Sequence, residues 1–439
     1  MTHHSAAAQV TTVIIGGGQA GLAMSRALQM ASIDHVVLER GQVANSWRTE
    51  RWDSLRLLTP NWMTRLPGHR YDGGDPEGYM TAAETAAFLD HYRAVIAAPV
   101  VTGATVSAVE IDEPGRYRVR TTVGDWRCRS VVVATGACTT PHVPALAGRL
   151  PGRIQQLTPT AYRNPDTVDG ERVLVVGASA GGAQIADELA RAGRDVTLAA
   201  GNHVRVPRTY RGMDIHWWMD RLGLLDERWT EVDDIVRARR TPSLQVVGHP
   251  DRRPLDLNTL QANGATVVGR LAGVTDTAVQ FSGSLANTVT SADLKLGRLL
   301  DAIDDHVDAT GLGAEVAAPD RPAATVVAEA PLLRSPADID AVLWATGYRP
   351  HYTWLPEQLL DRKGAIVHEG GVMAAPGMYV LGLPFLRRRK SSFLDGVGPD
   401  ALDLADHLVG WLDGRGHASS RPAPGGPGIR RSDPVGVAL

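Results

Sequence analysis

Two short glycine-rich segments of this chain have the residue types and the spacing that bind the phosphates of a dinucleotide. The first runs from Gly16 to Gly21 and the second from Gly177 to Gly182. Each follows an apolar segment typical of a buried strand and precedes an amphipathic segment typical of a helix. In such a unit the glycines allow a tight turn and a close approach to a pyrophosphate, which meets the positive end of the helix. We therefore expect the chain to hold two nucleotides at once.

The first segment favours a nucleotide without a 2′-phosphate. Its second expected strand, residues 35–38, ends in Glu39, which lies 23 positions after Gly16. A carboxylate there accepts hydrogen bonds from ribose hydroxyls and repels a 2′-phosphate. The segment therefore predicts a site for FAD or NAD, and its alternative is a glycine-rich loop without a ligand.

The second segment departs from the glycine pattern at its centre, where Ser179 stands. Serine is small and can donate its hydroxyl to a phosphate. No acid closes the next expected strand, residues 195–199, and cationic residues follow it, among them Arg205 and Arg208. Because an arginine can hold a 2′-phosphate, we expect NADPH here, rather than NADH, with these two arginines as ligands. The alternative for each of them is a solvated loop position.

Composition limits the other classes of function. The chain has 439 residues, 45 basic and 48 acidic, for a formal net charge of −3, which does not favour a nucleic-acid partner. No apolar run approaches the roughly 18 residues of a membrane span, and the N-terminus does not resemble a signal peptide, so we expect a cytoplasmic protein. We expect no metal site, because His and Cys do not occur at ligand spacing.

Two local features leave alternatives open. Cys128 and Cys138 do not form a C-x-x-C pair, which counts against hydride transfer to a dithiol. The basic run at residues 387–390 is either a solvated loop or a phosphate-facing segment.

Two further apolar segments share the same ending, Ala-Thr-Gly. One ends at Gly136 and the other at Gly347. Their positions predict an α/β fold of two Rossmann-like domains, with the NADP domain inserted into the FAD domain. The expected FAD domain comprises residues 1–152 and 336–417. The expected NADP domain comprises residues 153–335, with a helical insertion at about 209–258, and residues 418–439 form an expected disordered tail.

These units, with the segments 46–48, 52–61, 66–68 and 393–398, resemble the class B flavoprotein monooxygenases. That group includes flavin-containing monooxygenases, YUCCA enzymes and Baeyer–Villiger enzymes, and the chain looks especially like bacterial flavoproteins described as monooxygenase-like or as involved in potassium transport. The resemblance implies that NADPH reduces FAD, that oxygen adds at flavin C4a, and that the resulting (hydro)peroxyflavin oxygenates a small organic substrate. N-oxygenation, S-oxygenation and Baeyer–Villiger oxidation are all open. The partners implied are that substrate and O2, and a homodimer is one assembly to be expected.

One departure from the family pattern leaves a second function open. The family motif F-x-G-x-x-x-H has Leu150 and Gln156 at its first and last positions here. This counts against Baeyer–Villiger activity and favours an alternative, an NAD(P)H:acceptor flavin oxidoreductase that inserts no oxygen. A nucleotide-sensing protein without turnover is a third alternative.

Position and resemblance together assign the site residues. Asn61, in a loop expected over the flavin, and Trp52 are the candidate catalytic residues, although Asn61 is equally well explained by a proline-led turn. The candidate cofactor-binding residues are Gly16, Gly18, Gln19, Ala20, Gly21, Glu39, Arg40, Ser46, Trp47, Val106, Ala134, Thr135, Gly136, Gly177, Ser179, Ala180, Gly182, Arg205, Arg208, Gly347, Gly396 and Val397.

Overall fold

The first of two parallel sheets is built around the first glycine turn. A computed structural model describes residues 7–414, so the tail expected at 418–439 lies outside the described residues. The sheet has the strand order β25 (His368–Glu369), β26 (Val372–Met373), β27 (Met378–Val380), β10 (Ser130–Val133), β2 (Thr12–Ile15), β3 (His35–Leu38) and β6 (Val100–Val101). The five strands from β27 to β6 pair in parallel.

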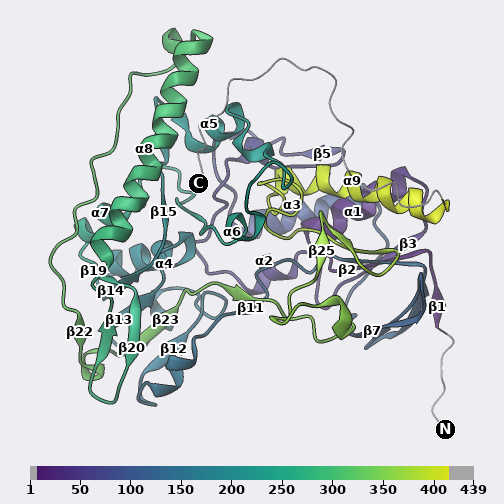
Figure 1. Ribbon diagram of the computed structural model, residues 1–439, viewed down its shortest axis with the longest axis horizontal. Helices are drawn as coiled ribbons and strands as arrows, with labels where there is room; N and C mark the ends of the chain where they lie inside the picture. Colours follow the sequence, from purple (N-terminus) through teal and green to yellow (C-terminus); the bar gives the residue numbers. More distant parts are fainter. Residues whose placement is uncertain (1–6, 415–439) are drawn as a thin grey trace.

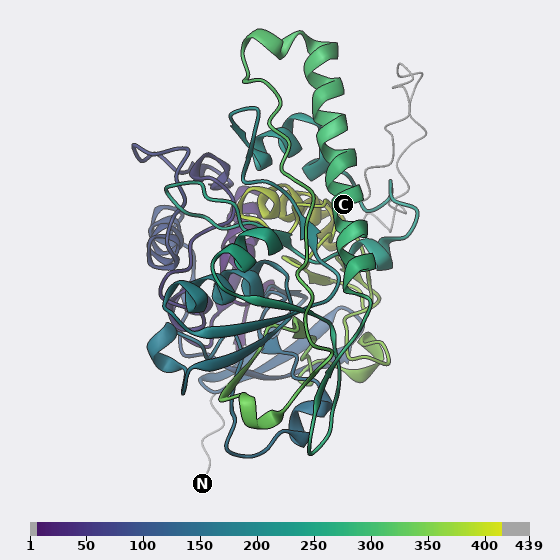
Figure 2. The same cartoon turned by 90° about the vertical axis from the view of Figure 1, so that its left-hand side faces the viewer.

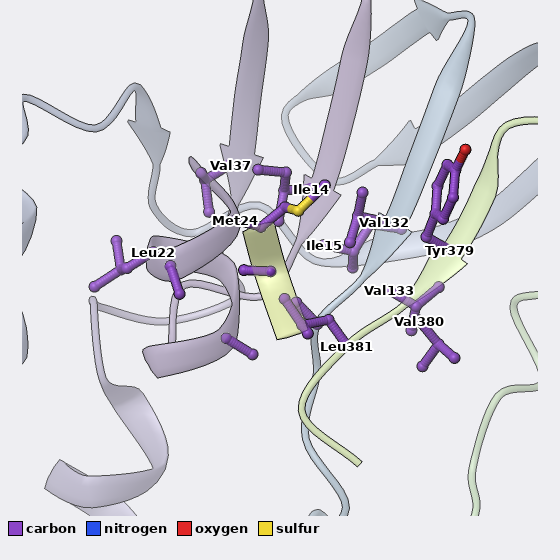
Figure 3. Close-up of a cluster of buried hydrophobic side chains, with 14 of the residues drawn as sticks. Ile14, Ile15, Leu22, Met24, Val37, Val132, Val133, Tyr379, Val380 and Leu381 are labelled. Atoms are coloured by element: carbon purple, nitrogen blue, oxygen red, sulfur yellow. The ribbon is translucent and has the colours of Figure 1, made fainter. Parts of the chain in front are cut away.

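Helix α1 (Gln19–Met30) directly follows β2 and packs on this sheet and on α9 (Leu394–Leu412). Leu22 and Met24 of α1 are fully buried, as are Ile14 of β2 and Val37 of β3. Figure 3 shows Met24 next to Ile14 between the helix and the strands. Continuous apolar strands of this kind are expected where both faces of a parallel sheet are covered.

The second sheet surrounds the second glycine turn. Its order is β12 (Gln155–Leu157), β23 (Ala341–Trp344), β13 (Arg172–Val176), β14 (Asp195–Ala200) and β19 (Thr266–Gly269), all parallel. Helix α4 (Ala180–Arg191) follows β13 as α1 follows β2. The predicted fold class, α/β with two dinucleotide-binding domains, is confirmed (Figure 1).

One expected domain boundary is wrong, because β23 belongs to the second sheet. We placed the return to the first domain at residue 336 because the Ala-Thr-Gly ending of this strand repeats that of β10. The repetition has a different cause: β23 pairs with β13 as β10 pairs with β2. Each sheet has its own strand of this kind, and the chain rejoins the first sheet only at β25 to β27.

The expected helical insertion at 209–258 has little helix. It contains α5 (Ile215–Arg221) and α6 (Ile235–Ala238), joined by irregular segments. It packs on the 26-residue helix α8 (Leu285–Thr310), which stands along one side of the molecule and projects beyond it in Figure 2. Their shared core contains Trp218, Leu299 and Ile303, each fully buried. Buried Trp218 is therefore a core residue of this part of the molecule.

The remaining elements are short strands and helices around the two sheets. They are the strands β1 (Ala8–Gln9), β4 (Arg65–Leu66), β5 (His69–Arg70), β7 (Val106–Glu113), β8 (Arg116–Thr121), β9 (Gly124–Cys128), β11 (Thr140–Pro141), β15 (Val204–Arg205), β16 (Thr209–Tyr210), β17 (Met213–Asp214), β18 (Leu244–Gln245), β20 (Leu271–Val274), β21 (Val279–Phe281), β22 (Leu333–Arg334) and β24 (Tyr348–Arg349), and the helices α2 (Asn45–Thr49), α3 (Ala82–Val95) and α7 (Leu257–Ala262). Within residues 7–414, none of the helices has the length and apolar character that crossing a bilayer requires.

Candidate dinucleotide sites

The first glycine turn is shaped by contacts within the protein, except at its centre. Gly16 has a φ of 114° and donates its N–H to Leu38 O at 2.8 Å. A β-carbon on Gly16 would lie 2.5 Å from Ala134 O, and one on Gly21 would lie 1.8 Å from Gly16 O. A β-carbon on Gly18 would meet nothing within 4 Å. The turn is therefore closed on the side of the sheet and open at Gly18, the position where a pyrophosphate approaches the backbone.

The N-terminus of α1 has the free donors that a phosphate needs. Gly18 is the N-cap residue, and neither a capping side chain nor an acidic residue occupies the first turn. The first N–H groups of a helix have no partner within the helix, and the macrodipole adds positive potential there. This end of α1 fits an anionic group.

Glu39 lies at the end of β3, where a ribose would follow the phosphates. Its side chain is 7% exposed and accepts hydrogen bonds from Gly17 N at 2.7 Å and Gly41 N at 2.9 Å, one on each oxygen. A carboxylate has about four acceptor positions. The two amides fix its orientation and leave it able to accept from ribose hydroxyls. Arg40, beside it, is exposed and forms an ion pair with Glu50.

The second glycine turn has the same construction. Gly177 has a φ of 111° and donates to Ala199 O at 3.0 Å. A β-carbon on Gly177 would lie 2.3 Å from Ala345 O, and one on Gly182 would lie 1.9 Å from Gly177 O. Ser179 is the N-cap of α4, yet its hydroxyl makes no capping hydrogen bond. The structure thus leaves the Ser179 hydroxyl available to a phosphate, beside Ala180 at the start of the helix.

The arrangement around Arg205 and Arg208 contradicts their expected role as 2′-phosphate ligands. Arg205 is 3% exposed and bonds to Asp256 and Asp293, each at 2.7 Å. Arg208 is 2% exposed and bonds to Asp214 at 2.5 Å. Both guanidinium groups are buried and neutralised within the protein, so a phosphate would have to displace a carboxylate. The partners of Arg205 come from distant segments, whereas Asp214 lies six residues after Arg208, and the sequence does not show that this nearby pair is buried.

The Asp214 group also joins the insertion to the first domain. Burial raises the pKa of the Asp214 carboxyl. Hydrogen bonding to His216 and the positive charge of Arg208 outweigh this effect and lower the pKa of Asp214 well below its usual value. Tyr79, from the segment before α3, donates its hydroxyl to Asp214 at 2.7 Å. Arg208 donates to Leu58 O at 2.8 Å. The cluster is therefore a structural junction between the two domains.

Two tryptophans from the segment after β3 lie where the domains meet. Trp52 is 7% exposed, and a β-carbon on Gly181 would lie 3.9 Å from its ring. It packs in the core of the second domain although it precedes α3 of the first. Trp47, next to half-buried Ser46 in α2, packs against the cores of both domains, and Arg51 lies 5.2 Å from its ring centre. This segment connects the first glycine unit to the second.

Asn61 is engaged in holding a loop. Its side chain is 4% exposed, donates from Nδ2 to Asp75 O at 2.9 Å and accepts at Oδ1 from Met80 N at 2.8 Å. Its backbone N–H donates to Gly78 O at 2.9 Å. These bonds close the segment 75–80 and favour the turn alternative over a catalytic role.

The ends of the two Ala-Thr-Gly strands differ in their surroundings. Buried Ala134 donates its N–H to Ile15 O at 2.8 Å, and half-buried Gly136 follows Thr135 with a φ of 75°. Exposed Gly347 accepts from His142 N at 2.8 Å, at the start of the β11–β24 ribbon. Val106 is half-buried at the first position of β7.

The start of helix α9 lies beside the first glycine turn. The helix begins at Leu394 and contains Pro399. Gly396 is required there, since a β-carbon would lie 1.9 Å from Lys390 O, and Val397 is fully buried. Gln19 donates from Nε2 to Ser392 O at 2.7 Å, and this bond holds the start of α9 against the start of α1. A β-carbon on Gly382 would lie 2.8 Å from that of Ala20, so α1 also lies close to the segment after β27.

The basic run 387–390 joins the two domains, and neither sequence interpretation anticipated this. Arg389 pairs with Glu227, and Lys390 pairs with Asp226 at 3.1 Å and Asp395 at 2.9 Å. Burial lowers the pKa of the Lys390 ammonium group. Hydrogen bonding to Asp395 outweighs this effect and raises the pKa of Lys390 above its usual value. Backbone bonds between residues 225–229 and 387–390 run alongside. We call this set of contacts the interdomain clamp. Its acidic partners in the other domain, Asp226 and Glu227, lie far earlier in the sequence, so no local pattern indicates the clamp.

Gln156, at the position of the family-motif histidine, lies on β12. Its Oε1 accepts from Trp344 Nε1 at 3.0 Å, and its Nε2 donates to Ala147 O at 3.2 Å. Trp344 belongs to β23, the neighbouring strand. The glutamine therefore holds two parts of the second domain together.

Known proteins resemble the chain over nearly its whole length. An oxidoreductase described as CzcO-like from Geobacillus kaustophilus is 30% identical over 91% of this chain and 98% of its own length. The chain belongs to the CzcO-like oxidoreductase family. Residues 13–216 also match the family model described as pyridine nucleotide-disulphide oxidoreductase.

Two other proteins extend this relation. Indole-3-pyruvate monooxygenase YUCCA4 from Oryza sativa is 28% identical over 93% of this chain and 89% of its own length. A flavin-containing monooxygenase from Stenotrophomonas maltophilia has the same fold, with a TM-score of 0.65 and 22% identity over 92% of this chain and 99% of that chain. The resemblance inferred from the sequence is confirmed, and with it an enzyme of a flavoprotein oxidoreductase family that uses FAD and NADPH.

Proposed function

We propose that the protein is an NADPH-dependent FAD monooxygenase that oxygenates a small organic substrate. The observation that carries this proposal is the pair of equivalent glycine turns joined by the segment after β3, in which Ala44 donates to Gly17 O of the first turn and Trp52 lies beside Gly181 of the second. Electron transfer between two nucleotides requires that they meet, and the segment after β3 touches both units. The relation to the YUCCA and flavin-containing monooxygenases supports oxygen insertion.

The first unit would hold FAD and the second NADPH. In this proposal the open backbone at Gly18 meets the FAD pyrophosphate and Glu39 accepts from its ribose. The hydroxyl of Ser179 and the first N–H groups of α4 meet the NADPH phosphates. When bound, these cofactors supply hydride and activate oxygen, and the protein supplies orientation and a dry site.

Several residues of this chain would then position the reacting parts. Trp52 and Trp47 form an apolar wall between the domains, which excludes water from the place where the two nucleotides meet. Gln19 fixes the start of α9 through Ser392, and the N-terminus of that helix would favour negative charge on a flavin. The remaining candidates at strand ends, Ala134 to Gly136, would line the flavin side.

The test follows the flavin spectrum of the purified protein. FAD should copurify, and anaerobic NADPH should bleach it. Admission of oxygen should then produce a long-lived absorbance that belongs to neither reduced nor oxidised FAD, and it should decay faster when a suitable amine, sulfide or ketone is present. Direct return to the oxidised spectrum contradicts oxygen insertion.

A second function is an NAD(P)H:acceptor oxidoreductase that transfers electrons without inserting oxygen. It is favoured by Gln156 and Asn61, which stand at or near positions that carry function in the monooxygenases but make structural bonds here. This function predicts NADPH oxidation that yields one H2O2 per NADPH with every substrate tested. Product that carries an atom of labelled oxygen excludes it.

A further inference from the structure

The two glycine units can be aligned by their hydrogen bonds, which identifies equivalent residues. Gly16 N donates to Leu38 O in the first unit, and Gly177 N donates to Ala199 O in the second. The next residue along each strand is therefore Glu39 in one unit and Ala200 in the other. The position that holds the ribose-directed acid in the first unit carries no charge in the second. A 2′-phosphate is not repelled there.

Arg270 lies beside this position. Strand β19 pairs with β14 in the register Ala200 to Gly269, and Arg270 is the next residue. Its Cδ and Cγ would lie 3.7 and 3.8 Å from a β-carbon on Gly201, the residue after Ala200. The arginine stem thus crosses the end of β14.

The charge of Arg270 is available to a ligand. The side chain is exposed, and among residues 7–414 the structure gives its guanidinium neither a hydrogen bond nor an ion pair. Arg205 and Arg208, by contrast, are buried and paired with carboxylates. A planar guanidinium can bind a phosphate with two parallel hydrogen bonds.

We propose that Arg270 recognises the 2′-phosphate of NADPH and that Ala200 permits this by leaving the strand end uncharged. The inference rests on the part of the proposed function that places a nicotinamide nucleotide in the second unit. It is independent of whether oxygen is inserted.

The experiment measures nucleotide binding to the FAD-loaded protein by calorimetry, with NADP⁺ and NAD⁺ as probes. Arg270→Ala should weaken NADP⁺ binding about tenfold to a hundredfold, the range for losing hydrogen bonds to a charged group, and should leave NAD⁺ binding within twofold. Arg270→Lys should retain part of the preference. Arg298→Ala is the matched control, because Arg298 is an exposed arginine of α8 for which the described residues show no ion pair.

A second variant adds a negative charge at Ala200 and leaves Arg270 in place. Ala200→Glu recreates the acid of the first unit and should weaken NADP⁺ binding more than NAD⁺ binding. Equal losses for both nucleotides, or an unchanged preference in Arg270→Ala, overturn the role of Arg270 and leave the second site standing. If the wild-type protein binds neither nucleotide, the proposed function itself fails.

Discussion

Substituting Gly18 by alanine should separate the binding of FAD from the folding of the turn. The φ of Gly18 is −87° with a ψ of −169°, a conformation that alanine adopts readily, and the added β-carbon meets nothing within 4 Å. An alanine in a compatible conformation restricts the unfolded chain and stabilises by about 0.4–1 kcal/mol. Without FAD, the variant should therefore be as stable as the wild type or slightly more so.

With FAD the same variant should be impaired. The methyl group would occupy the space through which a pyrophosphate approaches the backbone, and we expect FAD affinity to fall at least tenfold, about 1.4 kcal/mol. Urea unfolding of the FAD-free protein measures the first effect, and fluorescence titration with FAD measures the second.

Gly21→Ala is the control that should behave in the opposite way. Its β-carbon would lie 1.8 Å from a backbone oxygen, which cannot move aside as a flexible side chain can. This variant should lose several kcal/mol of stability without any ligand, the scale of severe core substitutions. If Gly18→Ala binds FAD within twofold of the wild type, the pyrophosphate does not pass this glycine and the assignment of the first site is refuted.

Three further variants test other parts of the structure. Arg205→Ala should cost about 3–5 kcal/mol of stability, because it leaves buried Asp256 and half-buried Asp293 without their cationic partner, and should not alter the ratio of NADP⁺ to NAD⁺ affinity; a selective loss of NADP⁺ binding would restore its ligand role. Asn61→Ala should cost about 1–3 kcal/mol in urea unfolding through the lost bonds to Asp75 and Met80, whereas a large fall in kcat at unchanged stability would mark Asn61 as catalytic. Burial, with the charge of Arg239, lowers the pKa of His368 to about 4, so the unfolded chain takes up a proton between pH 6.5 and 4 that the folded protein does not, and stability falls in that window by about 3 kcal/mol. His368→Asn keeps an acceptor for Gly371 N and should flatten this pH dependence of unfolding, and an unchanged slope would exclude His368 as its source.

The sequence was sufficient for the features that depend on neighbouring residues. Both glycine turns, their strands and the helices that follow lie where the local pattern places them, because the glycine spacing has a steric cause that the contacts of Gly16 and Gly177 show. Glu39 also lies directly after β3, where the local sequence places it.

What the sequence could not reveal depends on contacts between distant segments. The acids that pair with Arg205 are distant in sequence, and only the fold shows that Arg208 is buried with nearby Asp214, so local reasoning took two buried structural arginines for ligands. The strand pairing of β23 was hidden because the same Ala-Thr-Gly ending serves both sheets. Arg270 follows a strand far from the second glycine segment in sequence, and only the register of β19 on β14 brings it beside the end of β14.

The interdomain clamp has a consequence for how the enzyme works through a catalytic cycle. A hinge motion that separates the two domains would break these ion pairs and the adjacent backbone hydrogen bonds together. Thermal fluctuations rarely supply the free energy that this requires. Turnover would then proceed without separation of the two domains. A coenzyme bound at the second glycine turn, as proposed above, would therefore enter and leave while the clamp stays closed.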